Sequence, residues 1–406
     1  MTALPADLLN DTGAKAIFAA FPKDTVRFVG GCVRNGLLGE DIKDIDLATQ
    51  LTPPAAMDAL KAANIRYVET GVEHGTVTAV IDGQPYEITS LRRDVATDGR
   101  RATVAYSTDW AEDAQRRDFT VNALYGDRDG HIYDPTGLGL EDAETKHFRF
   151  IGEAKDRIAE DYLRILRYFR FMAWYAPNAK FDPAALKACR EGKSGLKSLS
   201  AERVWSEIKN LLLAPRPHRV VNVMLQQDIL ETLLPEASNA EGLSLITKLE
   251  SREAIKPDPY LRLMAMAARQ PLPIALLAKR LKMSKKESAR LRQWADDGTP
   301  LDPAASDREK RQAIYKAGKQ VVIDRARLRA AGEPDPVMSS RWMSLADLAM
   351  GWTQPEFPIS GKDLKAAGVP PGEDMGRKLK ALEALWVRSG FTADKPKLMM
   401  ALKLLG

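Results

Sequence analysis

The stretch Gly30-Gly31-Cys32-Val33-Arg34-Asn35-Gly36-Leu37-Leu38-Gly39 is followed closely by Lys43-Asp44-Ile45-Asp46-Leu47-Ala48-Thr49. An apolar run, Val26 to Val29, leads into the glycine pair and predicts a strand that turns directly into a helix. Residues two apart in a strand point to the same face of the sheet. We therefore expect Asp44 and Asp46 to project side by side from a second strand.

The spacing of these two acidic residues indicates a cation site. Two carboxylates held this close repel each other unless a positive charge lies between them. Mg²⁺ prefers a few carboxylates together with phosphate oxygens, which makes Asp44 and Asp46 candidate ligands. Glu87, in the alternating run Tyr86-Glu87-Ile88-Thr89, is the candidate third carboxylate from a neighbouring strand. The simpler explanation is a solvated strand edge, because Asp-x-Asp is a common pattern.

The glycine pair complements this acidic pair. Gly30 and Gly31 have no Cβ, so a phosphate group can approach the backbone N–H groups where the strand enters the helix. Arg34 follows within the first helical turn and is suited to clamp the same phosphates bidentately. A tight turn would explain Gly-Gly alone. Together with Asp44 and Asp46 a short distance downstream, the pattern favours a nucleotide site.

The composition is typical of a globular protein, but the charged residues are unevenly distributed along the chain. Of the 406 residues, 45% are hydrophobic and 28% charged. Residues 1–150 carry 16 Lys and Arg against 24 Asp and Glu, a net charge of −8, and the other 256 residues carry 44 against 31, a net charge of +13. This asymmetry is compatible with metal at one end and a polyanion at the other, or with simple fluctuation between domains.

Targeting and redox signals are sparse. No apolar run approaches the roughly 18 residues of a membrane span, and no signal peptide is expected at the N-terminus. The two cysteines, Cys32 and Cys189, form neither a disulfide framework nor a metal-ligand spacing. We therefore expect a cytoplasmic protein without membrane association.

Periodicity divides the chain into two kinds of structure. The first 150 residues mix short strands with helices, and from about Glu153 helical periodicity continues to the end. The fold class is therefore α+β, a mixed head with a small sheet followed by an all-helical remainder. The expected strands and helices of the head are Val26–Val29, Ile45–Ala48, Thr76–Ile81 and Tyr86–Leu91, and Val33–Leu38 and Pro54–Ala62.

Two further stretches concentrate arginines, Arg116-Arg117-Asp118-Phe119-Thr120-Val121-Asn122-Ala123 and Glu160-Asp161-Tyr162-Leu163-Arg164-Ile165-Leu166-Arg167-Tyr168-Phe169-Arg170-Phe171. In the second, the residues Tyr162, Ile165, Leu166, Phe169, Met172 and Ala173 form one apolar stripe at helical spacing. Its arginines lie on the opposite side, with Asp161 next to Arg164. Leu163 and Phe171 share that side, so we expect it to be partly covered. A covered arginine needs an acceptor, which a bound nucleotide would supply.

Taken in order, these motifs resemble those of the class II tRNA nucleotidyltransferases and their bacterial poly(A) polymerase relatives. Leu199-Ser200-Ala201-Glu202-Arg203 resembles a further motif of the family, and the resemblance covers roughly residues 20–215. Asn35 stands where many relatives carry Asp, and because Arg34 is kept we expect little consequence. The resemblance implies a nucleotidyltransferase head (1–150), a helical neck that reads the base (151–215) and an elongated helical body and tail that bind tRNA (216–406).

The resemblance also implies a role for each matching residue. Asp44 and Asp46 would be the catalytic Mg²⁺ ligands. Gly30, Gly31, Arg34, Arg117 and Asn122 would bind the incoming CTP or ATP. Asp161 and Arg164 would meet the Watson–Crick edge of its base as a protein template. Arg167 and Arg170 would also belong to the nucleotide site, where they would support that pocket or touch phosphate.

The implied activity is untemplated addition of CCA to the 3′ end of tRNA. A poly(A) polymerase, an enzyme that adds only A or only CC, and a non-catalytic RNA-binding relative are the alternatives. The segment Asp94–Thr108, expected as a loop, would distinguish CCA addition from the poly(A), A-only and CC-only activities. A basic stretch is expected to bind RNA through Lys279, Arg280, Lys282, Lys285 and Lys286, and Ser284 to cap the helix that follows. The sequence leaves both a monomer and a homodimer open.

Overall fold

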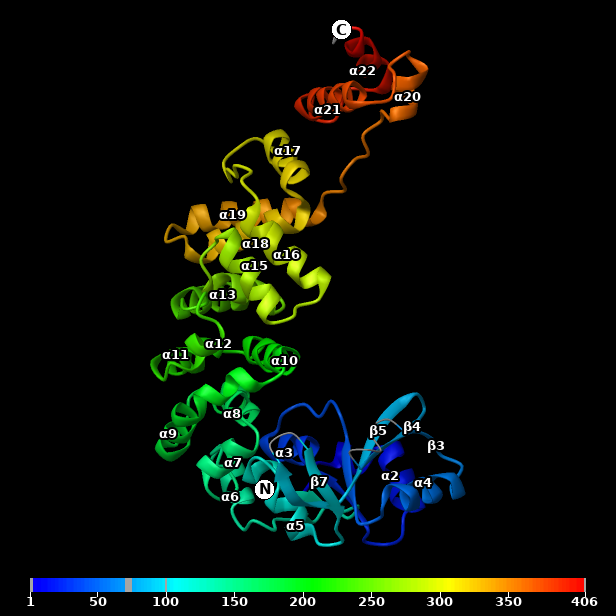
Figure 1. Ribbon diagram of the computed structural model, residues 1–406, viewed down its shortest axis with the longest axis vertical. Helices are drawn as coiled ribbons and strands as arrows, with labels where there is room; N and C mark the ends of the chain where they lie inside the picture. The colour runs from blue at the N-terminus through cyan, green and yellow to red at the C-terminus, as the bar shows by residue number, and fades with distance from the viewer. Residues whose placement is uncertain (1–2, 70–74, 99–100, 405–406) are drawn as a thin grey trace. The chain divides into compact units, whose positions relative to one another are not determined.

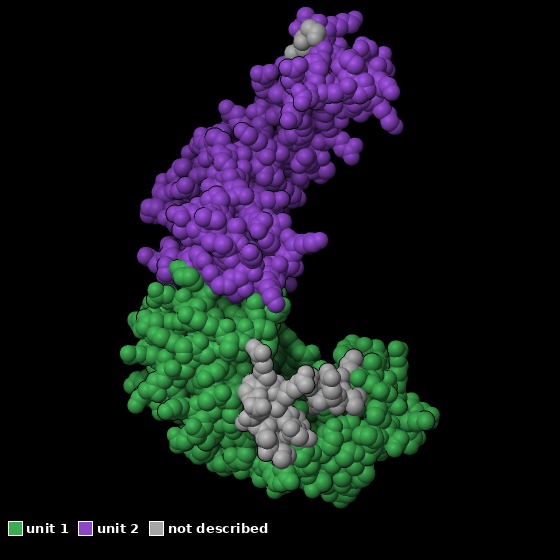
Figure 2. Space-filling model, viewed as in Figure 1, with its two compact units in different colours: residues 1–235 green, residues 236–406 purple. Residues whose placement is uncertain are grey.

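The computed structural model describes residues 3–69, 75–98 and 101–404 and divides into two compact units, Met1–Pro235 and Glu236–Gly406 (Figures 1 and 2). Unit 1 holds a seven-stranded sheet and the helices that follow it, and unit 2 is helical. This arrangement confirms the α+β class. The expected three-part division at residues 150 and 215 stays a prediction.

The sheet of unit 1 has the strand order β3-β4-β5-β2-β1-β8-β9. Its neighbours are antiparallel except β2 and β5, which run parallel with Asp46 opposite Glu87. The strands are β1 (Val26–Val29), β2 (Asp46–Thr49), β3 (Arg66–Val68), β4 (Thr76–Ile81), β5 (Gln84–Ser90), β8 (Tyr125–Gly126) and β9 (Ile132–Tyr133).

Short helices connect and flank these strands: α1 (Ala6–Leu9), α2 (Thr12–Ala20), α3 (Gly31–Leu38), α4 (Pro53–Ala62), α5 (Trp110–Gln115), the 3₁₀ turn η2 (Thr120–Asn122) and α6 (Gly139–Glu144). Helices α2 and α4 lie together beside β3, β4 and β5 (Figure 1). Helix α3 packs on β1, η2 and α6, which places its first turn at the end of the central strand β1.

The four expected strands and two expected helices are present within two residues of their predicted ends. The turn between β4 and β5 is formed by Asp82 (φ 53°) and Gly83 (φ 79°), with Ile81 paired to Gln84. Positive φ at both central residues is the requirement of the type I′ two-residue hairpin turn, which explains the glycine.

Two expectations about the head are wrong. Asp44 precedes β2 instead of lying in it, because Gly30 turns the chain away directly after β1 and leaves no antiparallel partner beyond Asp46. Part of the segment Asp94–Thr108, expected as a loop, belongs to a separate two-stranded hairpin of β6 (Arg92–Asp98) and β7 (Arg101–Tyr106). The side chains of residues 94–104 lie outside the described residues.

After the sheet, unit 1 continues through α7 (Ala154–Glu160), α8 (Leu163–Tyr175), α9 (Pro183–Gly192), the 3₁₀ turn η3 (Lys193–Ser198), α10 (Ala201–Leu212), α11 (Pro217–Gln226) and α12 (Ile229–Leu233). The predicted apolar stripe of α8 is buried, apart from half-buried Tyr162, and Leu163, Tyr168 and Phe171 are buried as well. The arginine side of this helix is therefore partly covered, as expected.

An aromatic cluster joins α8 to the segments around Phe119 and Phe150, which form an isolated β-bridge outside the sheet. The ring of Phe171 lies 5.3 Å from that of Phe119 and 5.6 Å from that of Phe148, and the ring of Tyr168 lies 5.5 Å from that of Phe150. All five side chains are at most 3% exposed. Ring pairs at these distances add to the free energy gained by burying their surface. The arginines of α8 are thereby held against the head.

Unit 2 contains α13 (Ala240–Arg252), α14 (Pro259–Met266), α15 (Pro271–Arg280), α16 (Lys285–Asp296), α17 (Asp307–Ala317), α18 (Lys319–Gly332), α19 (Pro336–Gly351), α20 (Gly361–Ala366), α21 (Glu373–Arg388) and α22 (Lys395–Leu402). Ser284 caps α16 as predicted, in a capping box with Glu287. None of the helices in the described part of the chain combines the length and hydrophobicity of a membrane span.

Candidate active site

The first turn of α3 is shaped for close approach to the backbone. Gly30 precedes the helix with φ 67°, a conformation that favours glycine. A Cβ on Gly31 would lie 3.9 Å from Nη2 of Arg34 and 4.0 Å from Oδ2 of Asp46. The missing side chain of Gly31 therefore leaves open the space between a guanidinium and a carboxylate, beside the N–H groups at the start of the helix.

Asp44 and Asp46 line one cavity together with Gly31 and Arg34, although only Asp46 belongs to β2. Burial raises the pKa of Asp46, and the charges of Glu87 and Asp44 raise it further against the opposing effect of Arg117 and Arg34. In the described part of the chain, no hydrogen bond is donated to the carboxylates of Asp44 and Asp46. A divalent cation would relieve this repulsion, so the donor set fits Mg²⁺.

Glu87 stands beside Asp46 in the parallel pair of β2 and β5. Among the residues that the structure describes, no three or more His, Cys, Asp or Glu side chains gather as a ready metal-binding group. The role of Glu87 as a third carboxylate stays a prediction.

Arg34 is 6% exposed and is surrounded by neutral partners. Its guanidinium donates to Oδ1 of Asn122 (2.5 Å), to the hydroxyl of Tyr175 (2.9 Å) and to Oδ1 of Asn35 (2.8 Å). Its Cζ lies 4.8 Å from the centroid of the Phe171 ring. Burial lowers its pKa. Because none of these partners is a carboxylate, the positive charge of Arg34 remains available to an anion in the cavity.

Arg117 contrasts with Arg34, because it is already paired. Its Nη2 donates to Oδ2 of Asp113 at 2.9 Å, and its Nε donates to the hydroxyl of Tyr125 at 3.1 Å. Burial alone would raise the pKa of Asp113, but Arg117 and Arg116 outweigh it and lower the pKa to about 2. A Cβ on Gly30 would lie 3.7 Å from Nη1 of Arg117, so this fixed guanidinium flanks the glycine turn.

A chain of hydrogen bonds leads from Arg34 to the helices that follow the head. Asn122, which accepts from Arg34, donates to Oδ1 of Asp118 at 2.9 Å. The other oxygen of Asp118 accepts from Nε of Arg167 at 2.7 Å. Burial opposes ionisation of Asp118, but Arg167 and the hydrogen bonds outweigh it and lower the pKa. The head and α8 are thus linked through one buried carboxylate.

Glu207, on α10, completes this network. It accepts from Nε of Arg170 at 2.6 Å and lies 3.8 Å from Nη1 of Arg167. Protein carboxylates therefore already serve as acceptors for Arg167 and Arg170, whereas the sequence indicated a bound nucleotide as the source of acceptors.

Asp161 and Arg164 are not paired with each other through their side chains. Asp161 is extended (φ −152°) between α7 and α8, and it accepts from the N–H of Leu163 and from Nη2 of Arg203 (2.6 Å). Arg164 donates to Glu160 at 2.6 Å and to the carbonyl of Arg116 at 3.2 Å. The backbone N–H of Arg164 donates to the carbonyl of Asp161 at 3.0 Å, so the two residues are neighbours as expected, and their joint role in reading the base stays a prediction.

One cavity of ≈ 410 Å³ collects part of the predicted site: Gly31, Arg34, Asp44, Asp46 and Arg170. Its remaining lining residues are Asn35, Glu40, Asp41, Lys43, Trp174, Tyr175 and Asn210. The predicted residues Gly30, Glu87, Arg117, Asn122, Asp161, Arg164 and Arg167 do not line it. Of these, Asn122 and Arg167 are tied to the cavity wall by the hydrogen-bond chain.

Comparisons with known proteins agree with this geometry. Residues 26–149 match the family model for the poly A polymerase head domain, and residues 178–241 match that for the probable RNA and SrmB-binding site of polymerase A. The human mitochondrial CCA tRNA nucleotidyltransferase 1 is 32% identical over 96% of this chain and 90% of its own length. The chain belongs to the CCA tRNA nucleotidyltransferase family.

Bacterial members of the family are similarly close. The CCA-adding enzyme of Lactobacillus johnsonii is 30% identical over 88% of this chain and 87% of its own. The crystal structure of the Bacillus stearothermophilus CCA-adding enzyme in complex with CTP superposes with a TM-score of 0.72 at 27% identity, covering 90% of this chain and 89% of that one. This chain is therefore a nucleotidyltransferase.

Several residues of this nucleotidyltransferase site were not predicted from the sequence. Asp118 and Glu160 stand inside the quoted motifs, and their positions beside arginines were the available signal. Tyr175 and Glu207 carried no local signal, because they reach Arg34 and Arg170 only through the tertiary fold. Asn35, noted as a departure, is a direct partner of Arg34.

We expect Glu207→Gln to reduce nucleotide incorporation by about tenfold, since the substitution removes the charge that orients Arg170 in the cavity wall. Steady-state kinetics with CTP and ATP measure the change. Glu231→Gln, an exposed position on α12, is the matched control and should behave as the unchanged chain. Equal activity of the two variants would contradict a positioning role for Glu207.

Proposed function

We propose that this chain adds CCA to the 3′ end of tRNA from CTP and ATP, without a nucleic-acid template and with release of pyrophosphate. One observation carries the proposal. The unpaired carboxylates of Asp44 and Asp46 line the same cavity as the guanidinium of Arg34, which has no carboxylate partner among the described residues. A triphosphate and a divalent cation are the groups that satisfy both sides at once.

In this proposal, the residues of the first turn of α3 bind the triphosphate. Arg34 donates to its oxygens, and the N–H groups that follow Gly30 favour negative charge. Asp44 and Asp46 would hold Mg²⁺, which would supply charge neutralisation and lower the pKa of the terminal ribose hydroxyl of the tRNA. The hydroxyl gives up its proton to water, its oxygen bonds to the α-phosphorus, and the bond to the pyrophosphate oxygen breaks, so that pyrophosphate leaves.

Base selection is assigned to Asp161 and Arg164. A carboxylate accepts from the exocyclic amine that C and A both carry, and a guanidinium donates to a ring nitrogen or carbonyl. Arg203 and Glu160, which already hold these two side chains, would fix their orientation before the base arrives. U and G present a carbonyl where the amine is needed, which leaves a buried polar group unpaired.

Arg164→Ala should lower the preference for CTP and ATP over UTP and GTP by about 5- to 150-fold, the cost of about 1–3 kcal/mol for one unpaired group. The measurement is kcat/KM for each of the four nucleotides. Arg190→Ala, an exposed position on α9, serves as the control for a lost guanidinium. An unchanged preference in Arg164→Ala would count against the protein-template assignment.

The basic stretch of unit 2 is proposed to bind tRNA phosphates. Lys279, Arg280, Lys282, Lys285 and Lys286 are all exposed, and Arg280 pairs with Glu236. We expect the double change Lys285→Ala and Lys286→Ala to weaken tRNA binding and to reduce the slope of log affinity against log salt by about one for each phosphate that is no longer bound. Lys61→Ala, on α4, is the control. An unaltered slope would exclude these lysines from the interface.

The decisive experiment incubates the purified chain with tRNA lacking its 3′ CCA and with each labelled nucleotide. Addition of two C residues followed by one A supports the proposal. Addition of A alone, of C alone or of a long A tract would instead assign one of the related activities. Binding of tRNA without any incorporation would identify a non-catalytic relative.

A further inference from the structure

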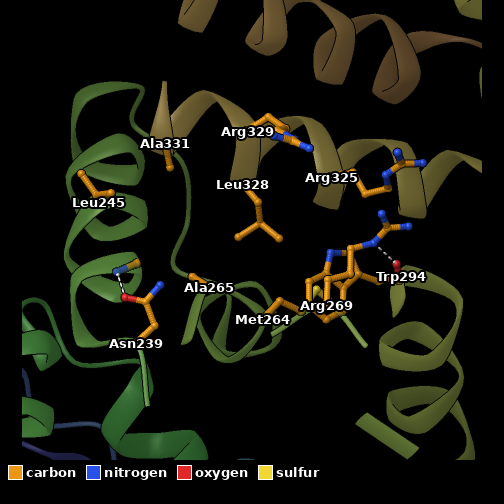
Figure 3. Close-up of a pocket in the computed structure, with 12 residues that line it drawn as sticks. Asn239, Leu245, Met264, Ala265, Arg269, Trp294, Arg325, Leu328, Arg329 and Ala331 are labelled. Atoms are coloured by element: carbon orange, nitrogen blue, oxygen red, sulfur yellow. Dashed lines mark hydrogen bonds between the residues drawn. The ribbon is translucent and has the colours of Figure 1, made fainter. Parts of the chain in front are cut away.

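A second cavity lies entirely within unit 2, far along the chain from the nucleotide site. It is formed by α13, α14 and α18, with Trp294 of α16, and has a volume of ≈ 340 Å³ (Figure 3). Its lining residues are Asn239, Gly242, Leu245, Met264, Ala265, Arg269, Trp294, Arg325, Leu328, Arg329, Ala331 and Gly332. This volume is within the range of pockets that hold small molecules, about 300–1,000 Å³.

The inner wall of the cavity is apolar. Leu328 extends from α18 toward Met264 and Ala265, and Leu245 faces the same space from α13 (Figure 3). Gly242 keeps α13 close to α14, because a Cβ there would lie 2.1 Å from the carbonyl oxygen of Ala265. A side chain at that position would push the two helices apart. The cavity therefore depends on a close helix contact and offers a hydrocarbon surface.

The cavity also collects positive charge. Arg269, Arg325 and Arg329 line it, and none of the described lining residues is acidic. Arg325 pairs with Asp297, which is not among the lining residues. Arg269 is fixed by its bonds to two backbone carbonyls, one of them that of Trp294 at 2.7 Å. Three guanidinium groups thus share one carboxylate, which leaves an excess of positive charge at an apolar pocket.

Arg329 is the least compensated of the three. It is exposed, and the described residues give it no hydrogen bond or ion pair. It stands four residues after Arg325 on α18, where two like charges face each other and destabilise the helix. Burial and the charges of Arg325 and Arg329 lower the pKa of Arg269, although Asp297 opposes them. An anion at this place would relieve the repulsion among all three.

We propose that this cavity is a binding site for a small amphiphilic anion, whose carboxylate or phosphate meets Arg269, Arg325 and Arg329 and whose apolar body lies against Leu245, Met264 and Leu328. Guanidinium groups match the planar, bidentate geometry of such head groups. The inference is independent of the proposed function, because no residue of the cavity belongs to the nucleotide site.

An RNA backbone fits this cavity less well. Phosphates of a duplex are met by exposed side chains on an open surface, and sugars offer no apolar body for the Leu245 and Leu328 wall. Arg269 and Arg329 are exposed, but they line one cavity together with the apolar wall of Leu245, Met264 and Leu328. The geometry points to a separate small molecule.

The test uses the full-length chain and octyl phosphate below its micelle concentration, with octanoate as the carboxylate counterpart. Inorganic phosphate supplies the head group alone, and 1-octanol the apolar body alone. We expect octyl phosphate, octanoate or both to raise Tm and to bind by calorimetry, with phosphate and octanol much weaker. The stronger of the two amphiphiles identifies the preferred head group.

Two variants make the site specific. Arg329→Ala should weaken amphiphile binding by about fivefold or more, since it removes one charged donor. Ala331→Phe should abolish binding by filling the cavity while leaving Tm equal or higher. Arg311→Ala, an exposed arginine on α17, should bind as the unchanged chain.

Absence of binding by both amphiphiles at millimolar concentration would overturn the proposal, as would binding that neither Arg329→Ala nor Ala331→Phe alters. Weaker tRNA binding by Arg329→Ala, without any amphiphile binding, would instead assign these arginines to an RNA surface.

Discussion

Asp46→Asn should reduce nucleotide incorporation by about 10³-fold or more. The substitution removes one of the two charges proposed to hold Mg²⁺ at the triphosphate, and a metal in this role supplies several kcal/mol of transition-state stabilisation. The measurement is single-turnover incorporation of CMP and AMP. Asp58→Asn, exposed on α4, is the control for loss of a head-domain carboxylate. Incorporation within tenfold of the unchanged chain would defeat the metal assignment.

The same variant should be at least as stable as the unchanged chain in metal-free buffer. The folded-state pKa of Asp46 is raised, so the charged form is disfavoured by folding. The cost is absent below the ordinary pKa of Asp, about 3.9, and grows as pH rises through the folded pKa. Thermal unfolding at pH 4 and pH 7.5 should therefore show a gain in Tm for Asp46→Asn at the higher pH. Added Mg²⁺ should raise Tm only in the unchanged chain.

Arg34→Lys should lower kcat/KM for CTP and ATP by about 10²-fold or more. Lysine keeps a positive charge but cannot reproduce a planar group that bonds Asn35, Asn122 and Tyr175 while facing the triphosphate. Removal of two charged hydrogen bonds at about 1.5–3 kcal/mol each accounts for this size.

Arg27→Lys is the matched control for Arg34→Lys. Arg27 lies on β1 close to the glycine turn, but its guanidinium stacks on Trp110 and Tyr133 instead of facing the cavity. It should change stability more than catalysis. If both variants retained the nucleotide dependence of the unchanged chain, Arg34 would not be a triphosphate ligand.

The sequence predicted four strands of the sheet, β1, β2, β4 and β5, well because their patterns are local. Val26–Val29 and Thr76–Ile81 have the expected ends, since β-branched and aromatic residues alternate between turn residues. The two-residue strands Tyr125–Gly126 and Ile132–Tyr133 were not predicted. Strands this short carry too few residues for a periodicity and exist only because a neighbouring strand supplies their hydrogen bonds.

The sequence predicted those site residues that lie inside a short motif. It did not predict their hydrogen-bond partners that are distant in the sequence. Asp46, Gly31 and Arg34 were found because each stands in a short pattern with a chemical reason. The acceptors of the arginines were not found, because Glu207 is 37 residues from Arg170, and the sequence does not state which helices pack together. The pairing of Asp161 with Arg203 was missed for the same reason.

The aromatic cluster of Phe119, Phe148, Phe150, Tyr168 and Phe171 has a practical consequence for anyone who shortens this protein. A truncated version that stopped at residue 150 would expose the rings of Phe119, Phe148 and Phe150, which α8 normally covers. The resulting exposed hydrophobic patch would promote aggregation. A shortened protein that remains soluble would have to keep α8 and also α10, whose Glu207 pairs with Arg170 of α8.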